Sequence, residues 1–477
     1  MTNLVPYNTQ IKSVELVNFN GSFVLDLLPQ TVELTVYESL HETVHRASII
    51  IYDSISLFNN FPMIGEEIVL ITIENENNES KTYAYVIDAI NDISPTDKSR
   101  EVQYIIELNS ITTLPNTLLN VQHAYRGKMS DIVYNIFNQY ITTPLIQMKS
   151  KSKGIAYAIG QSVGNYWKFK NENIEESLGD DDGTIIIPNR RPLEAVQWLS
   201  EKAVPQDKNS YKYMFWQAND GFHFETIQKL YKKTAKRKFI YHSDSRIIDT
   251  LDDRDKRDSI TNIIFSNRIT TLKKNVAGYF QNSLFELNLS QLTYKATPST
   301  IEDFKTNIEG NSARYNTDLY SEMMKRSGEI NGTLETNNRV KYTFNNRLDH
   351  DTVTPLHNQR INWGNAVRTS VALGHVDLII TVQGDYTIAA GDIVELDIAK
   401  MEGFNVGEGN EEDKFITGRY LVTDVKNIFQ TSGGMHSTVL RINKDTYTTD
   451  PDNVVFAYGE GYALDVAGVL SRNERNN

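Results

Sequence analysis

Apolar and polar residues alternate along much of the first part of the chain. Val32, Leu34 and Val36 share one side of the segment 31–37, and polar residues occupy the other side. A period of two residues is typical of a β-strand with one buried face. Similar short apolar runs recur between polar turns, at residues 13–19, 22–28, 47–52, 65–74, 82–90 and 102–110. Because Asn20-Gly21 is a favoured hairpin turn, we expect these runs to pair as an antiparallel barrel or sandwich.

A helical period replaces this alternation after Leu114-Pro115. The segment 128–141 carries one apolar stripe, with Ser130 or Asp131 available as its N-cap. A second helix is expected from Pro192, because proline suits the first turn of a helix and an apolar stripe follows it. Such stripes usually pack into a core, so neither predicts a cofactor site.

Strand character returns at residues 211–230, around an Asn219-Asp220-Gly221 turn. Residues 270–365 are more polar, and the pattern predicts a helix within them at 313–328. The remainder of that stretch has no periodicity from which its packing can be derived.

The C-terminal strands repeat the order of the N-terminal ones. A Gly-acidic turn opens the run 65–74, and a similar turn opens the run 391–398. The matching positions of the next strand are Ile87, Ile90 and Ile93 in the first copy and Val422, Val425 and Ile428 in the second. Both copies then cross a polar turn into a final alternating strand, at 102–110 and 437–445. Any two antiparallel sheets share some alternation, but this ordered series favours a duplicated β-domain.

Length and composition limit the classes to which the chain can belong. Its 477 residues suffice for about two to four domains. The absence of cysteine excludes disulfides, thiol nucleophiles and cysteine-based zinc sites, and fits synthesis in a reducing cytoplasm. No apolar run approaches the roughly 18 residues that a membrane span needs. The N-terminus also lacks the basic and apolar regions of a signal peptide, so we expect neither secretion nor membrane insertion.

The charge pattern argues against a nucleic-acid-binding protein. The formal net charge is −13, whereas tight binding to phosphates normally needs a basic face. The largest basic run, 231–238, is followed by the acid-rich segment 243–258, so the local charge nearly cancels. We interpret the basic run as a solvated loop or hairpin tip, with an electrostatic contact to a partner as the alternative. The acidic segment 179–183 predicts no calcium site, because Leu178 stands where the first ligand belongs.

The segment 40–45 contains the zinc-peptidase pattern H-E-x-x-H, formed by His41, Glu42 and His45. In those enzymes the pattern lies on a helix, where both histidines bind Zn²⁺ and the glutamate polarises the bound water. Here strand-like segments precede and follow the pattern, so we expect a turn between two strands. A turn gives the two imidazoles no fixed common face. We therefore predict no metal, cofactor or catalytic site.

Three stretches of the sequence together resemble the central baseplate hub protein of contractile-tailed bacteriophages, which is similar to the hub portion of VgrG spikes in type VI secretion. They are VELTVYESLHETVHRASIIIYDSISLFNNFPMIGEEIVLITI, then IIIPNRRPLEAVQWLSEKA, then VQGDYTIAAGDIVELDI with GRYLVTDVKNIF. The resemblance covers residues 8–245 and 375–445. In that family the segment that holds HETVH joins two tube-domain strands. VgrG chains continue into a spike domain, so the spike of this protein is expected to be a separate polypeptide.

The resemblance implies a homotrimer without enzymatic activity, in which each chain contributes two tube-like β-domains. Three chains then form a pseudo-sixfold ring between a sixfold tail tube and a threefold central spike. The implied partners are the tail tube protein, the tail spike protein and other baseplate proteins, in the tail baseplate of a virion made in the host cytoplasm. DNA is expected to pass through the ring without specific binding, which suits the acidic balance of the chain.

The combined expectation is a mostly β (α+β) fold, with two related tube-like antiparallel β-barrel domains, a small helical insert domain and a polar insert. The expected domains are a first tube-like β-domain (1–115), a helical insert domain (116–206), a β segment that completes or links the hub domains (207–260), the start of the second β-domain with the long polar insert (261–370), the second tube-like β-domain (371–447) and a C-terminal tail (448–477).

Two other classes of function remain open on the sequence alone. One is an enzyme associated with a tail, either a zinc peptidase through HETVH or a cell-wall hydrolase with acidic residues such as Asp181 and Glu194. Glu194 is explained more simply as an acid in the first turn of a helix. The other class is a carbohydrate-binding β-protein of a virion or cell surface. The four tryptophans are spread thinly along the chain and do not indicate a stacking platform for sugars.

Overall fold

The computed structural model describes most of the chain. The described residues are 9–61, 63–74, 79–95, 101–162, 166–179, 184–207, 209–242, 253–267, 274, 276–279, 281–288, 292–300, 340–345, 355–398, 413 and 415–446. Asp181, the helix predicted at 313–328 and the tail from 448 onward lie outside them.

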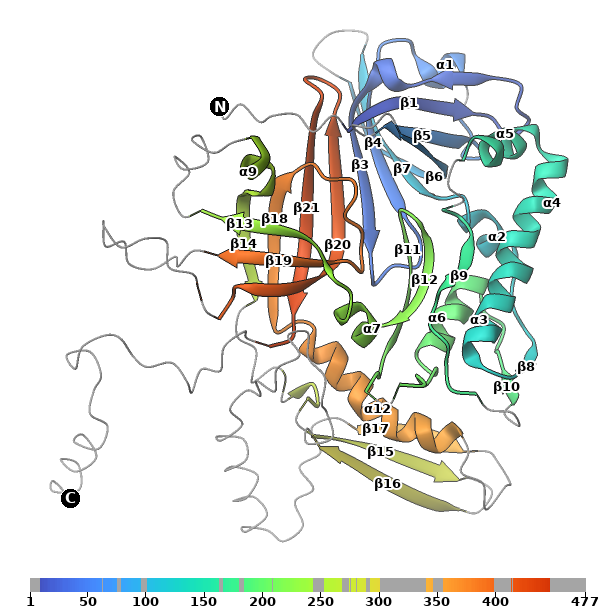
Figure 1. Cartoon of the computed structure of the whole chain (residues 1–477). Helices are drawn as coiled ribbons and strands as arrows, with labels where there is room; N and C mark the ends of the chain where they lie inside the picture. Colours follow the sequence, from blue (N-terminus) through green and yellow to red (C-terminus); the bar gives the residue numbers. More distant parts are fainter. Residues whose placement is uncertain are drawn as a thin grey trace, which may run out of the picture.

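Most of the described strands form one large, mainly antiparallel sheet (Figure 1). Within the described residues its thirteen strands are β1 (Gln10–Val17), β2 (Val24–Asp26), β3 (Thr31–Ser39), β4 (Arg46–Asp53), β5 (Ile68–Glu74), β6 (Ser80–Pro95), β7 (Val102–Ser110), β13 (Ala235–Tyr241), β14 (Ile260–Asn267), β18 (Val376–Gln383), β19 (Ile393–Ile398), β20 (Gly418–Gln430) and β21 (Met435–Lys444). Their order is β14-β18-β21-β20-β3-β4-β7-β6-β5-β1-β2, with β19 also paired to β20 and β13 paired to β19. The mostly β, α+β fold class expected from the sequence is confirmed.

The two halves of this sheet repeat one arrangement of strands. The order β5-β6-β7-β4-β3 in the first half matches β19-β20-β21-β18-β14 in the second. The irregularities match as well, because β6 shifts register against β7 after Ile87, and β20 shifts against β21 after Val422. A β-bulge is a specific feature of a strand, and chance alternation does not place it at the same point twice. The repeated sequence pattern therefore corresponds to a repeated sheet.

The two copies differ at the end of β6. A second bulge lies between Asn91 and Ser94, with Asp92 at a φ of 53°, and adds a residue that β20 lacks. Ser94, rather than Ile93, therefore takes the position of Ile428 in the repeat. The aligned pairs that keep equivalent partners in the neighbouring strand are Ile87 with Val422 and Ile90 with Val425.

β3 also contains a bulge that its alternating sequence does not reveal. Its register against β4 shifts between Thr31 and Glu33, and Val32 is 40% exposed. Leu34 and Val36 are buried as predicted. The prediction that Val32 shares their side is wrong, because a bulge changes the face toward which the residues beyond it point.

Alternate residues of the strands form the core of each half. Ala47, Ile49 and Ile51 of β4 are buried in the first half, and Leu440 and Ile442 of β21 are buried in the second. Successive strand residues point to opposite faces, so the other face of the sheet keeps the polar and charged side chains. The second half also curls back on itself, since β13 meets the start of β14 through a bridge between residues 240 and 259.

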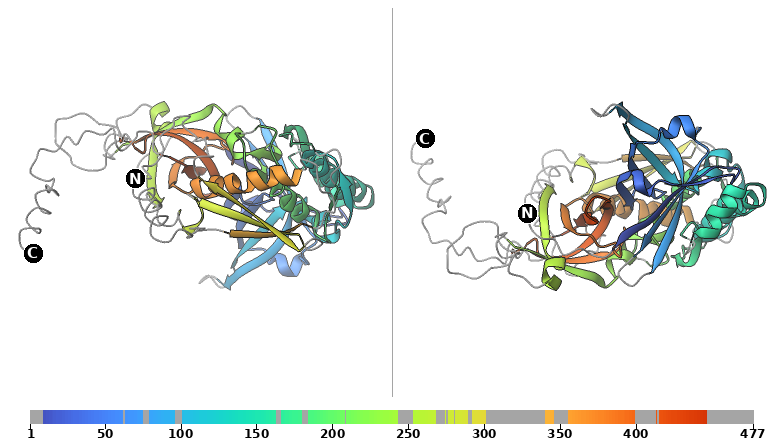
Figure 2. Two further views of the ribbon diagram at one scale, coloured as in Figure 1. Left: turned by 90° about the horizontal axis from the view of Figure 1, so that it is seen from below. Right: turned by 90° about the horizontal axis from the view of Figure 1, so that it is seen from above.

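Helices pack beside the first half of the sheet, at one end of the molecule (Figures 1 and 2). They are α2 (Thr113–Leu118), α3 (Met129–Phe137), the π-helical turn η2 (Asn138–Thr142), α4 (Thr143–Lys151), α5 (Lys153–Gln161) and α6 (Pro192–Ser200), with the short strands β8 (Ala124–Arg126) and β10 (Thr184–Ile186) nearby. The Asn20-Gly21 hairpin rests on α5, where the backbone N–H of Gly154 donates to the carbonyl of Phe19 at 3.1 Å. The helices predicted at 128–141 and from Pro192 are confirmed as α3 with η2 and as α6.

The start of α3 differs from the prediction. The helix follows Lys128, and neither Ser130 nor Asp131 is its N-cap. Ser130 is buried instead, and its backbone N–H donates to the hydroxyl of Ser177 at 3.0 Å. The apolar stripe predicted the helix correctly. The cap was not predictable from the local sequence, because Ser130 contacts Ser177, which lies far along the chain.

The hairpin predicted at 211–230 forms but is shorter than expected. β11 (Tyr213–Ala218) pairs with β12 (Gly221–Thr226), and β9 (Phe169–Ile174) runs parallel to β12. The predicted second strand ends at Thr226, whose hydroxyl accepts a hydrogen bond from the N–H of Lys229 and caps α7 (Ile227–Tyr231). Threonine as an N-cap favours helix over further strand at this point.

A smaller sheet lies beyond the second half of the large one. It contains β15 (Gln281–Asn288), β16 (Thr293–Thr300) and β17 (Val340–Asn345), and α12 (Pro355–Ala372) packs on it (Figure 1). Gly364 of α12 lies so close to β15 that a Cβ atom there would come within 2.7 Å of the Asn282 side-chain oxygen. The chain also forms the short helices α1 (Leu57–Asn60), η1 (Leu28–Gln30) and α9 (Asp253–Asp258). Over the described residues, no helix has the length and apolar character of a membrane span.

Candidate functional site

The HETVH segment connects two strands, as the sequence predicts. β3 ends at Ser39 and β4 begins at Arg46, so His41, Glu42 and His45 lie in the connection between them. Glu42 forms an ion pair with the Nε of Arg46 at 3.0 Å, on the surface. His41 is exposed, whereas His45 is fully buried. The three side chains of the zinc-peptidase pattern therefore face different surroundings.

His45 is held by protein groups on both sides of its ring. Its Nδ1 lies 2.6 Å from the hydroxyl of Tyr85, and its Nε2 lies 3.4 Å from a carboxylate oxygen of Glu38. The backbone N–H of His45 donates to the side chain of Gln217 in β11 at 3.0 Å. Both ring nitrogens of His45 therefore have partners inside the protein. Over the described part of the chain, no group of three or more histidine and acidic side chains is arranged to hold a metal ion.

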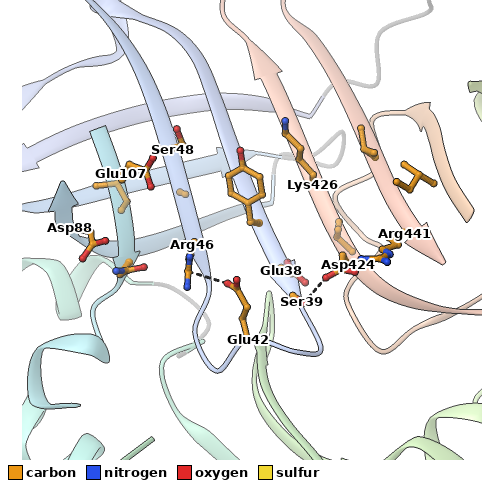
Figure 3. Close-up of a pocket in the computed structure, with 17 residues that line it drawn as sticks. Glu38, Ser39, Glu42, Arg46, Ser48, Asp88, Glu107, Asp424, Lys426 and Arg441 are labelled. Atoms are coloured by element: carbon orange, nitrogen blue, oxygen red, sulfur yellow. Dashed lines mark hydrogen bonds and ion pairs between the residues drawn. The ribbon is translucent and has the colours of Figure 1, made fainter. Parts of the chain in front are cut away.

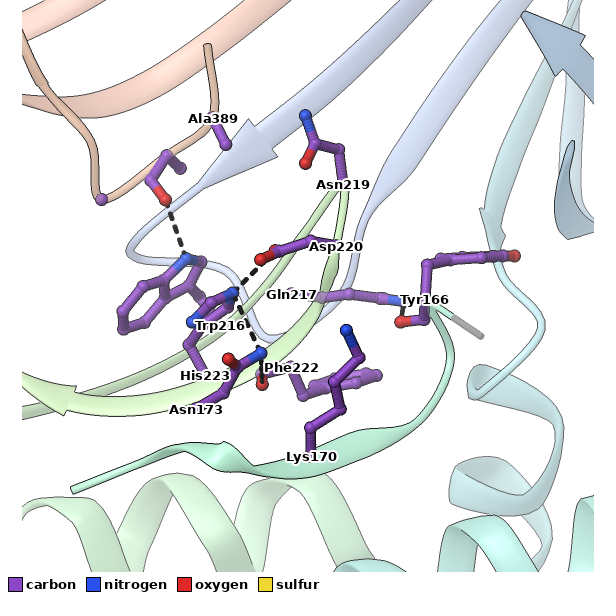
Figure 4. Close-up of polar contacts among 12 residues, drawn as sticks. Tyr166, Lys170, Asn173, Trp216, Gln217, Asn219, Asp220, Phe222, His223 and Ala389 are labelled. Atoms are coloured by element: carbon purple, nitrogen blue, oxygen red, sulfur yellow. Dashed lines mark hydrogen bonds and ion pairs between the residues drawn. The ribbon is translucent and has the colours of Figure 1, made fainter. Parts of the chain in front are cut away.

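Glu38 also links the two halves of the protein. Its second carboxylate oxygen accepts a hydrogen bond from the backbone N–H of Ala390, which precedes β19. The carbonyl of Ala390 in turn accepts a hydrogen bond from the indole of Trp216 at 3.0 Å (Figure 4). Gly391 follows with a φ of +94°, and a Cβ there would approach the Trp216 ring to 2.8 Å. The Gly-acidic turn of the repeat is therefore a tight contact point between the second half, β3 and β11.

An aspartate and a histidine pair across the tip of the β11–β12 hairpin (Figure 4). The Asp220 carboxylate lies 2.8 Å from Nε2 of His223, whose ring stacks on Trp216 at 4.9 Å between centroids. Burial opposes the charge of Asp220, but the hydrogen bond and the positive charge of His223 lower the pKa of this carboxyl overall. Asn173 of β9 also contacts this histidine, at 3.5 Å. On the other side of the ring, a carboxylate oxygen of Glu225 lies 3.9 Å from Nδ1 of His223. These contacts fix the hairpin.

The basic run 231–238 is not the solvated loop that its sequence predicts. Residues 235–241 form β13, parallel to β19. The ion pairs of the run are Lys232–Asp207, Lys233–Glu225, Lys236–Asp392, Arg237–Asp258, Arg237–Asp385 and Lys238–Asp397. Three of the six acidic partners, Asp385, Asp392 and Asp397, lie more than a hundred residues away, whereas Asp258 ends the acidic segment that follows the run. Both local and distant carboxylates therefore neutralise the basic run.

A hollow of about 440 Å³ lies where β3 meets β20, on the polar face of the sheet (Figure 3). Charged side chains of both signs line it, and several are paired. The Ser39 hydroxyl donates to Asp424 at 2.5 Å, and Arg441 binds Asp377 through Nε and Nη2 at 2.6 to 3.2 Å. Its residues come from several strands of both halves, so no local motif in the sequence could have revealed it. The hollow lies at the junction between the halves, and pairs within the chain hold several of its charged side chains.

The cell-wall hydrolase alternative named Asp181 and Glu194. Glu194 lies exposed in the first turn of α6, as its sequence context predicts, and Asp181 lies outside the described residues. Two of the four tryptophans, Trp167 and Trp216, are buried and unavailable for stacking on a sugar.

The two halves join edge to edge through β3 and the far part of β20. The strands are antiparallel, and Thr35 lies opposite Ile428, while Tyr37 lies opposite Lys426. β3 is thereby paired on both sides, with β4 and with β20. Its counterpart in the second half, β14, pairs within the described residues only with β18 along its length. The joint pairs two types of strand edge, that of β3 and that of the far part of β20. Within the described residues, the counterpart edges on β14 and on the far part of β6 are not joined in this way.

Comparison with known proteins yields similarity in structure only. No protein-family model matches the sequence, and no curated protein matches it. A tail protein from Neisseria meningitidis MC58 is similar in structure, with a TM-score of 0.48, 9% identity, and coverage of 92% of this chain and 98% of that one. The 43 kDa tail protein of prophage MuSo2 from Shewanella oneidensis has a TM-score of 0.47 and 10% identity, over 91% of this chain and 98% of that one.

A component of the type VI secretion system of E. coli, described as structurally similar to bacteriophage T4 tail proteins, has a TM-score of 0.38 and 10% identity, over 87% of this chain and 73% of that one. These structures belong to the group of tail and type VI secretion proteins that the sequence resembles.

Proposed function

We propose that the protein is a structural, non-enzymatic hub subunit of a phage tail baseplate. Three copies form a ring that adapts the sixfold tail tube to the threefold central spike. The observation that supports this most is the presence, in one chain, of two sheet units that share one strand order and one matching bulge and are joined edge to edge. Three chains with two equivalent units each present six similar units to one partner and threefold symmetry to another.

The symmetry of the ring indicates its partners, because a sixfold tube fits its six similar units and a threefold spike fits its three chains. The tail tube protein, the spike protein and other baseplate proteins bind the ring, and the assembly is located in the virion tail. The first tube-like unit corresponds to 1–115, and the second begins in 261–370, which also holds the polar insert, and continues in 371–447. Residues 116–206 are the helical insert and 207–260 the linking segment. The contacts of the Gly391 turn with Trp216 support a rigid link between the units, as an adaptor needs.

The same proposal includes passage of DNA through the ring. A conduit must not hold the phosphates that pass through it, and a chain with a net charge of −13 suits this requirement. The lysines and the arginine of the basic run 231–238 form ion pairs with carboxylates of the same chain, which reduces their attraction for phosphates.

Electron microscopy of the purified protein tests this function. The proposal predicts ring-shaped particles with a central opening, which bind purified tail tube protein on one side. Particles of single-chain size that bind no tube protein would contradict it.

A further inference from the structure

The joint between the two halves shows how one copy of the chain can bind the next. Inside the chain, the outer strand of the first half, β3, pairs with the far part of β20 in the second half. The repeat gives each of these strands a counterpart. β14 lies beside β18 as β3 lies beside β4, and β6 lies beside β7 as β20 lies beside β21. The counterparts are thus β14 and the far part of β6.

Register identifies the residues that correspond. Thr35 lies opposite Ser48 in β4, and Ile264 lies opposite Ile379 in β18, at the same place in the repeat. Ile428 lies opposite Ser437 in β21, and Ser94 lies opposite Gln103 in β7, again at the same place. The pair Thr35–Ile428 of the internal joint therefore corresponds to Ile264 and Ser94.

Both counterpart edges are exposed where the internal joint is covered. Residues 91–95 of β6 are all exposed and, within the described residues, pair with β7 alone. The equivalent part of β20 pairs on both sides, with β3 and β21. Ile93 of β6 is 59% exposed and Ile264 of β14 is 50% exposed, although both are large apolar side chains on strand edges.

Beyond the bridge that joins its start to β13, β14 has an unusual composition for a sheet edge in water. Proteins protect such edges with lysine, proline or a very short strand, because an open row of N–H and C=O groups pairs with other chains. β14 has the sequence ITNIIFSN, eight residues without a charge or a proline. On β6, the bulge at Asp92 and the proline at position 95 restrict the open edge to a short segment. A partner strand can therefore pair with this edge only in a register that fits the short segment.

We propose that β14 of one copy pairs antiparallel with residues 91–94 of β6 of a second copy, with Ile264 opposite Ser94. This inference rests on the proposed function and names the contact through which the ring closes. The two surfaces differ, so the contact is head to tail, and such contacts generate a ring when the rotation closes. Ile93, at the β6 bulge, then packs beside the apolar side chains of β14 and loses its exposure to water.

Disulfide trapping tests the contact, because the protein has no cysteine of its own. The double variant Ser94→Cys with Ile264→Cys is oxidised and separated on a non-reducing gel. Directly opposite antiparallel residues have Cα atoms about 4.5–5.5 Å apart, within disulfide reach. We expect covalent dimers and trimers from the double variant, and monomers from each single variant, because neither position faces its own copy.

A matched control distinguishes a wrong assignment of the β14–β6 contact from a failure of disulfide formation. Thr35→Cys with Ile428→Cys occupies the same register inside one chain and is expected to form an intramolecular disulfide. If wild-type protein is a trimer and the control oxidises, but the double variant stays monomeric on the gel, the assigned edges are wrong while the proposed function stands. Disulfide dimers from a single variant would also overturn the head-to-tail contact. A wild-type monomer would contradict the proposed function itself.

Discussion

Thr35 of β3 lies directly opposite Ile428 of β20, and this pair stands at the joint between the two halves of the protein. The two strands come from opposite ends of the sequence, yet their pairing makes one continuous sheet out of two repeated units. The same register leaves a β6 edge and a β14 edge open. Each chain thus contains one formed joint, between β3 and β20, and the two strand edges that can form a second joint with neighbouring copies.

A lysine on the open edge of β14 should prevent self-association without unfolding the chain. Ile264→Lys places a charge on an exposed strand position, where substitutions usually change the free energy of unfolding by no more than about 0.5 kcal/mol. We expect the variant to elute as a monomer at concentrations where wild type is trimeric, with an unchanged circular dichroism spectrum. Leu118→Lys, on the exposed end of α2, is the control and should assemble normally. A trimeric Ile264→Lys variant would argue against β14 as an interface strand.

The Arg237 ion pairs should contribute more to stability than the neighbouring lysine pair. Arg237 binds Asp258 at 2.8 Å and also binds Asp385, which is almost fully buried. Arg237→Ala leaves a buried carboxylate without its cation and is expected to cost about 3 kcal/mol of unfolding free energy. Lys238→Ala removes a half-exposed pair with Asp397 and should cost less than about 1 kcal/mol. Urea denaturation, followed by tryptophan fluorescence, measures the free energy of unfolding of both variants. Equal losses in the two variants would contradict the larger contribution assigned to the Arg237 ion pairs.

Buried histidines should make the protein less stable in mild acid. Burial lowers the pKa of His436 to about 3, with Asp385 acting in the opposite direction, and burial with the charge of Lys274 lowers that of His375 to about 2. Because these folded-state values lie below the ordinary value of 6.5, the unfolded chain takes up the protons first as the pH falls. Stability from neutral His436 is therefore present above about pH 6.5 and is lost progressively toward pH 3.

Between pH 7 and pH 5 the His436 contribution corresponds to about 2 kcal/mol. We expect the urea midpoint of wild type to fall over this range and the fall to be smaller in His436→Asn. His123→Asn, at an exposed position, should leave the fall unchanged. If His436→Asn keeps the full pH dependence of wild type, His436 is not its source.

Zinc should have no effect on the thermal stability of the protein. A ligand that binds the folded state raises the melting temperature by mass action. The ring of His45 is buried and contacts Tyr85 and Glu38, so it cannot meet His41 at a common ion without breaking both contacts. Melting curves with excess zinc and with a chelator should coincide. Stoichiometric zinc in the purified protein, lost in His45→Ala, would sink this interpretation.

The sequence predicted what depends on local pattern. The strands at 31–37 and 47–52, the helix at 128–141 and the Pro192 helix all follow from the periodicity and composition of short segments. The turn position of HETVH followed from the strands around it. The repeated strand series was visible because both copies keep the same apolar spacing.

What the sequence did not show depends on contacts between distant segments. The bulge that turns Val32 outward and the extra residue near Asp92 leave no mark in the alternation. The strand at 235–241 looked like a charged loop because its acidic partners, such as Asp392 and Asp385, lie more than a hundred residues away. The hollow beside Asp424 and the paired edges of β3 exist only after both halves have folded together.

The mass of the purified wild-type protein in solution tests the central claim most directly. Light scattering across a concentration series should give three times the 54.4 kDa mass of one chain. A trimer supports the ring built from two sheet units per chain. A mass of 54.4 kDa at every concentration would contradict it, because a chain that remains single cannot present six equivalent units to a tail tube.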